Sequence, residues 1–147
     1  MTNDNYGTPE DFRKTLGEKL GIKFSSYDPF PLNKDGLREY DGLGDWPEAE
    51  DNFLVNGPYS DPVPWLRRCI KETEKGKHVY AIVKGDTSTG WWHELVMPFV
   101  QPEDIHFVRG RVPFWNPKKQ KRTGANFATI VIHYQPLAPL MKTAAQS

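Results

Sequence analysis

The stretch that decides the fold is residues 53–62, which read FLVNGPYSDP. Its first three residues are apolar and predict a short buried strand, whereas the Asn-Gly-Pro that follows favours a turn. Asp61 and Pro62 are residue types typical of a helix start. The stretch therefore predicts a strand that turns directly into a helix, although Asn-Gly is by itself a common turn signal with no functional meaning.

Downstream of this turn the chain alternates helices with strands. The first predicted helix has an apolar face made of Trp65, Leu66, Cys69 and Ile70. Residues 78–83 are a near-continuous apolar run, which is typical of a central parallel strand. The further predicted elements are an amphipathic helix over 87–99 and strands over 105–109 and 127–134.

Upstream of the turn, a helix is predicted to start with Thr8 as N-cap and Pro9 at the first helical position. Its apolar residues, four positions apart, are Phe12, Leu16 and Leu20. Residues 22–27 are predicted to form a short strand that ends at Asp28. Residues 29–51 are rich in Pro, Gly and acids, and we expect mostly loop with one short helical turn.

Strands that alternate with helices predict an α/β fold with a largely parallel sheet. In such sheets, ligands bind at the carboxyl ends of the strands. Asp28, Asn56 and the Lys84-Gly85-Asp86 segment all fall at predicted strand ends. The sequence therefore predicts a ligand site around Asn56.

Charge is divided unevenly along the 147 residues, although the formal net charge is zero. Residues 1–61 carry 6 Lys and Arg against 13 Asp and Glu, and residues 62–147 carry 13 against 6. The basic second half indicates an anionic partner, unless the split is a chance division of solvated charges. The single Cys69 excludes an internal disulfide and a cysteine-based zinc site, and the histidines form no metal-ligand motif. No signal peptide or long apolar run is visible, so we expect a soluble, cytoplasmic protein without membrane contact.

Six short segments, taken in their order along the chain, resemble a known family. They are 6–9 (YGTP), 27–29 (YDP), 41–43 (DGL), 54–60 (LVNGPYS) with Trp65, 86–89 (DTST) with Trp91 and Trp92, and 109–111 (RGR) with Phe114. Together they resemble the small DNA N6-adenine methyltransferases of phages and related mobile elements. The resemblance implies one reduced, Rossmann-like methyltransferase domain over residues 1–147, with a mostly parallel sheet and a C-terminal antiparallel strand. We expect residues 136–147 to be a frayed tail.

The resemblance further implies transfer of a methyl group from S-adenosylmethionine to N6 of a flipped adenine in double-stranded DNA. Asn56 Oδ1 and the Gly57 carbonyl would accept the amine hydrogens, Pro58 would stiffen the turn, and Tyr59 would stack on the base. Tyr59 fits an ordinary core aromatic as well. The family usually has Pro at the position of Gly57. Since the backbone carbonyl does the accepting there, we expect Gly57→Pro to preserve or raise activity.

For the cofactor, the resemblance implies a site that comprises Tyr6, Thr8, Pro9, Asp28 and Asn56. No Gly-rich loop follows the first predicted strand, so the acid and the N-terminal segment would hold the cofactor. Asp28 fits a loop acid that caps a turn equally well, and Thr8 fits a helix N-cap.

A basic cluster lies between two predicted strands and comprises Lys118, Lys119, Lys121 and Arg122. Such a loop suits the phosphate backbone of DNA, and a solvated hairpin tip is the alternative. We add Arg111 to the DNA-binding set. In a strand, either Arg109 or Arg111 should point inward, where an arginine needs a carboxylate or phosphate partner.

Other interpretations stay open from sequence alone. One is an amino-methyltransferase that acts on RNA or on protein glutamine, since these amines need the same planar recognition. Another is a decayed, non-catalytic methyltransferase fold that binds DNA or protein, which Gly57 and the compressed segment 29–51 support. A third is an α/β domain of unrelated function. A homodimer is compatible with a domain this small, although no motif supports one.

Overall fold

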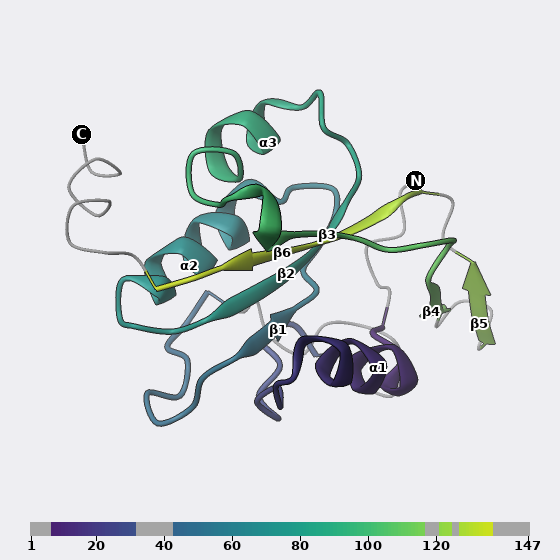
Figure 1. Cartoon of the computed structure of the whole chain (residues 1–147), viewed down its shortest axis with the longest axis horizontal. Helices are drawn as coiled ribbons and strands as arrows, with labels where there is room; N and C mark the ends of the chain where they lie inside the picture. Colours follow the sequence, from purple (N-terminus) through teal and green to yellow (C-terminus); the bar gives the residue numbers. More distant parts are fainter. Residues whose placement is uncertain (1–6, 32–42, 117–120, 125–126, 137–147) are drawn as a thin grey trace.

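The apolar residues before Asn56 form strand β1 (Phe53–Val55), and the chain then turns into helix α2 (Val63–Thr73), as predicted. The structure, a computed structural model, describes the whole chain except residues 1–6, 32–42, 117–120, 125–126 and 137–147. The predictions outside the described residues are those for Tyr6, Lys118, Lys119, positions 32–42 of the predicted 29–51 loop and the tail beyond residue 136. The fold is α/β, with helices on both faces of a four-stranded sheet (Figure 1).

The sheet is mixed, with strand order β1-β2-β6-β3. β1 pairs in parallel with β2 (Val79–Lys84), whereas β6 (Thr129–Tyr134) pairs antiparallel with both β2 and β3 (Ile105–Phe107). The C-terminal antiparallel strand is therefore confirmed. The expected mostly parallel pairing is not found, because β6 inserts between β2 and β3. Those two strands point the same way and would otherwise be parallel neighbours.

Strand β2 is buried on both faces, which explains its continuous apolar sequence. Helices α2 and α3 (Gly90–Leu95) cover one face, and α1 (Glu10–Leu20) covers the other (Figure 1). The β2 side chains on the α2 and α3 face are Val79, Ala81 and Val83, and those on the α1 face are Tyr80 and Ile82. The predicted apolar face of α2 is buried in the first of these layers.

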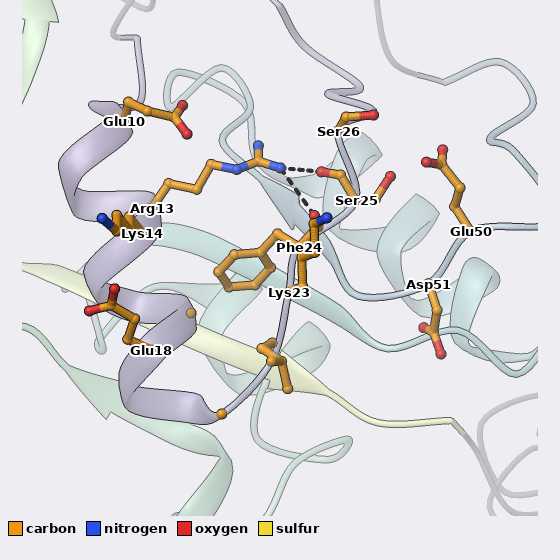
Figure 2. Close-up of a pocket in the computed structure, with 13 residues that line it drawn as sticks. Glu10, Arg13, Lys14, Glu18, Lys23, Phe24, Ser25, Ser26, Glu50 and Asp51 are labelled. Atoms are coloured by element: carbon orange, nitrogen blue, oxygen red, sulfur yellow. Dashed lines mark hydrogen bonds between the residues drawn. The ribbon is translucent and has the colours of Figure 1, made fainter.

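The N-terminal part differs from the prediction in two respects. Helix α1 begins at Glu10 with Pro9 as its N-cap and has no side-chain cap, so Thr8 does not cap it. Residues 22–27 form no strand. The guanidinium of Arg13 donates hydrogen bonds to the Phe24 and Ser25 carbonyls, which a neighbouring strand would otherwise use (Figure 2).

Helix α3 is shorter than the predicted span of 87–99. At its start, the Thr89 hydroxyl and N–H both bond to the Asp86 carbonyl in a turn. At its end, Pro98 disfavours a helical conformation for the residue before it, and the chain leaves the helix. The buried side chains of this segment are Trp92, Leu95 and Val96.

The remaining elements are the short helix η1 (Pro102–Asp104) and a separate antiparallel pair, β4 (Pro113–Asn116) and β5 (Lys121–Gly124). None of the described helices has the length and apolar character needed to cross a membrane.

A histidine pair lies where β2 begins, at the end of the sheet away from Asn56. His133 stacks on Tyr80 with ring centroids 4.1 Å apart, and its Nε2 lies 2.9 Å from His78 Nδ1. Burial, followed by the proximity of His78, lowers the pKa of His133 to about 4, although Asp104 partly opposes this. His133 is therefore kept neutral in the folded protein under mildly acidic conditions.

We expect the protein to lose stability as the pH falls from 7 to 5. Unfolded His133 takes up a proton near its ordinary pKa of about 6.5, whereas the folded protein resists protonation until about pH 4. Between these values the unfolded state binds more protons, so the free energy of unfolding should drop by about 1–2 kcal/mol. Urea unfolding at both pH values measures this. His133→Gln should remove most of the difference, and the exposed-site control His93→Gln should keep it. An unchanged difference in His133→Gln would contradict the assignment.

Candidate active site

Asn56 lies directly after β1, buried with 5% exposure, and its side-chain amide has a partner at each end. Its Nδ2 donates a hydrogen bond to Thr8 Oγ1 at 3.1 Å. Its Oδ1 accepts a hydrogen bond from the hydroxyl of Tyr59. These contacts join the N-terminal segment to the turn and hold the amide in one orientation.

Gly57 packs directly on the face of Trp65. A Cβ at this position would lie 2.7 Å from two carbons of the indole ring. The indole Nε1 in turn donates a hydrogen bond to the Pro58 carbonyl at 2.8 Å. The backbone of Gly57 is outside the left-handed region, so the position requires glycine because of space rather than conformation.

Tyr59 belongs to an aromatic cluster that also contains Phe114 and Phe127. The Tyr59 ring is 8% exposed and meets Phe127 edge-on, with centroids 5.2 Å apart. The Lys84 ammonium lies 5.8 Å from the Tyr59 ring centroid and 4.9 Å from that of Phe127. The sequence placed Lys84 at a predicted strand end without a specific role, and it did not single out Phe127. The strand-end position of Lys84 was a usable signal, whereas Phe127 had none beyond its aromatic side chain.

The carboxylate of Asp28 has a local role, and its loop is linked to the Asn56 turn through Phe30 and Trp65. Its Oδ1 accepts a hydrogen bond from the Phe30 N–H at 2.9 Å, so the acid caps a turn. The Phe30 ring packs edge-on against Trp65 at 6.2 Å between centroids. Trp65 therefore separates the Asp28 loop from the Gly57 turn and contacts both. Pro9, at the start of α1, is buried.

The basic residues occupy different positions from those expected. Lys121 and Arg122 lie within β5 rather than between strands. Arg122 Nη1 pairs with Asp11 Oδ2 at 3.0 Å, which ties β5 to α1 and lowers the pKa of the Asp11 carboxyl. Arg109 and Arg111 are both exposed and lie outside any strand, so the condition under which one of them would point inward is not met.

An open groove of about 980 Å³ runs along α1, between that helix and residues 22–26 and 50–51 (Figure 2). Its charged lining mixes both signs, namely Glu10, Glu18, Glu50, Asp51, Arg13, Lys14 and Lys23. Neither Asn56 nor any other residue of its turn lines the groove. The groove and the Asn56 turn are therefore separate features of the described structure.

Comparison with known proteins identifies the family of the chain. A family model described as DNA N-6-adenine-methyltransferase (Dam) matches residues 34–144. A DNA N-6-adenine-methyltransferase of Haemophilus phage HP1 (strain HP1c1) is 29% identical over 87 residues, which are 58% of this chain and 49% of the relative. The chain thus spans about half the length of this curated relative. No solved structure matches the chain. Because the family match extends over well more than half of the chain and includes the Asn56 turn, the chain belongs to the Dam family of DNA N-6-adenine-methyltransferases.

Proposed function

We propose that this protein transfers a methyl group from S-adenosylmethionine to N6 of an adenine in double-stranded DNA. The observation that carries the proposal is the buried Asn56 amide, held at both ends where β1 stops. Ligands of α/β sheets bind at this end of the strands. Family membership supplies the substrate class, and we infer a reduced Rossmann-like methyltransferase sheet from the parallel β1-β2 pair and the helices that cover it.

At the amine, Asn56 Oδ1 and the Gly57 carbonyl accept the two N6 hydrogens. An amide oxygen has two lone pairs, so Oδ1 can serve the adenine amine and the Tyr59 hydroxyl together. These acceptors orient the developing lone pair of N6 and stabilise the positive charge that builds there. The base stacks against the aromatic cluster. The Lys84 ammonium, which lies over the Tyr59 and Phe127 rings, must move aside from part of their surface.

The residues near the turn fit a cationic cofactor. The carboxylate of Asp28 supplies negative charge on the loop that packs against Trp65. A carboxylate has about four acceptor sites, so its bond to the Phe30 N–H is compatible with binding a ribose hydroxyl or an amino group. We propose Tyr6, Pro9, Asp28 and Asn56 as the cofactor set, and we assign the Thr8 hydroxyl to the Asn56 amide instead, because the two are hydrogen-bonded. S-adenosylmethionine supplies an already activated methyl group when bound, so the protein needs only to position the reactants.

We propose that the exposed basic residues Arg111 and Lys121 contact DNA phosphates, together with Lys118, Lys119 and Arg122. The double variant Arg111→Ala/Lys121→Ala should weaken binding and flatten the slope of log Kd against log salt by about 2, since each phosphate contact contributes roughly 0.9. Fluorescence anisotropy with labelled duplex DNA at several salt concentrations measures the slope. Arg67→Ala, an exposed site on α2, is the matched control. A double variant with the slope of the unchanged protein would remove both residues from the interface.

The experiment that tests the function uses purified protein, S-adenosylmethionine and unmethylated duplex DNA. The DNA is digested, and mass spectrometry measures N6-methyladenine and N4-methylcytosine. N6-methyladenine is the expected product. Parallel reactions contain RNA and a glutamine peptide, and methylation of either of these without methylation of DNA would overturn the substrate class. A protein that binds no cofactor by calorimetry and methylates nothing would be a non-catalytic member of its family.

A further inference from the structure

Thr8 lies outside the residues that the family model matches, yet it contacts the centre of the proposed site. Its Oγ1 accepts a hydrogen bond of 3.1 Å from Asn56 Nδ2, across 48 positions of sequence. The match to the family begins at residue 34, so this contact joins a segment beyond that match to the turn within it.

The hydroxyl of Thr8 is not used where local sequence would use it. A threonine before a helix commonly caps the first N–H groups, and such a cap stabilises a helix by about 1 kcal/mol. Here α1 has no side-chain cap, and its N-cap residue is Pro9. The Thr8 hydroxyl therefore contacts the Asn56 amide rather than the start of its own helix.

The amide of Asn56 depends on such a partner because its two ends have nearly the same shape but opposite hydrogen-bonding character. With Nδ2 bound to Thr8, Oδ1 lies on the side of Tyr59 and the aromatic cluster. Without the hydroxyl, Nδ2 would lack this acceptor in a buried site, and the amide could rotate to place Nδ2 against the phenol oxygen. Two donors, the amide and the adenine amine, would then face each other.

We propose that Thr8 is a positioning residue, whose hydroxyl fixes the Asn56 amide so that Oδ1 faces the substrate amine. This inference rests on the function proposed above. It assigns the threonine a role in orienting a catalytic side chain and not in direct contact with the cofactor.

The kinetic test compares Thr8→Val, which keeps the shape without the hydroxyl, with Thr8→Ser, which keeps the hydroxyl. Thr8→Val should lower kcat by about 10- to 100-fold, the range expected when a buried polar group loses its partner. Its KM for S-adenosylmethionine should stay nearly constant, and Thr8→Ser should restore kcat. The exposed Thr15→Val on α1 is the matched control. A raised KM for the cofactor with unchanged kcat, or no change in either constant, would overturn the proposal.

A second measurement does not depend on methylation. The side-chain NH₂ signals of Asn56 can be assigned in ¹⁵N NMR spectra by their loss in Asn56→Ala. Solvent exchange of these protons should accelerate about tenfold or more in Thr8→Val and return in Thr8→Ser, because a hydrogen bond in a buried site slows exchange. Unchanged exchange in Thr8→Val would overturn the contact itself. If exchange accelerates in Thr8→Val but neither the unchanged protein nor any variant methylates DNA, the contact between Thr8 and Asn56 is confirmed. The proposed function and the positioning role that rests on it are then both wrong.

Discussion

Asn56→Ala is expected to abolish methylation, with a loss in kcat of at least about 100- to 1,000-fold, the usual cost of removing one oriented group that stabilises charge in the transition state. The alanine cannot accept a hydrogen from the substrate amine, and it leaves the Gly57 carbonyl as the single acceptor. Single-turnover assays with labelled S-adenosylmethionine and duplex DNA measure the methyl-transfer step directly.

The control for this substitution is Asn56→Asp. A carboxylate keeps an acceptor toward the amine, and the Thr8 hydroxyl can turn to donate to its second oxygen. We therefore expect Asn56→Asp to exceed Asn56→Ala in activity by about tenfold or more. The alanine variant also removes a partner from Thr8 and Tyr59, at a cost of about 1–3 kcal/mol, so thermal unfolding must show that it is folded at the assay temperature. A folded Asn56→Ala protein with near-normal activity would remove Asn56 from the site.

Gly57→Ala is expected to destabilise the protein by about 1–3 kcal/mol and to reduce methylation by about 100-fold. The new Cβ would meet the Trp65 indole at 2.7 Å, far inside normal contact distance, so the turn or the indole must shift. A shift of the turn displaces both the Gly57 carbonyl and the adjacent Asn56, and misplacement by about 1 Å can cost about 100-fold in rate. The urea midpoint and kcat measure the two effects.

Gly57→Pro should behave in the same way, because proline also carries a Cβ. The structure thus reverses the expectation, taken from the family pattern, that proline would preserve or raise activity. Gly44→Ala is the matched control, since no atom lies within 4 Å of its new Cβ. Combining Gly57→Ala with Trp65→Leu should cost less than the sum of the single changes, because the smaller side chain makes room. Unaltered stability of Gly57→Ala would show that the indole moves aside freely.

The sequence by itself determined the features that depend on neighbouring residues. The order of apolar and turn residues predicted β1, the turn at Asn56, helix α2 and its buried face, since local periodicity reflects which side of an element is covered. The unbroken apolar run of β2 likewise predicted a central strand, although only one of its two neighbours pairs with it in parallel. The ordered motifs pointed to the family and to Asn56, because the chemistry of a planar amine needs particular residue types close together.

Only the tertiary structure decided the features that depend on contacts between distant segments. The insertion of β6 between β2 and β3 made the sheet mixed, and residues 22–27 lie outside the sheet, with two of their carbonyls bonded to Arg13. The partner of Thr8 and the indole against Gly57 had no signal in local sequence. Each of these depends on which distant segments meet after folding, whereas the periodicity of the sequence reports which face of an element is buried.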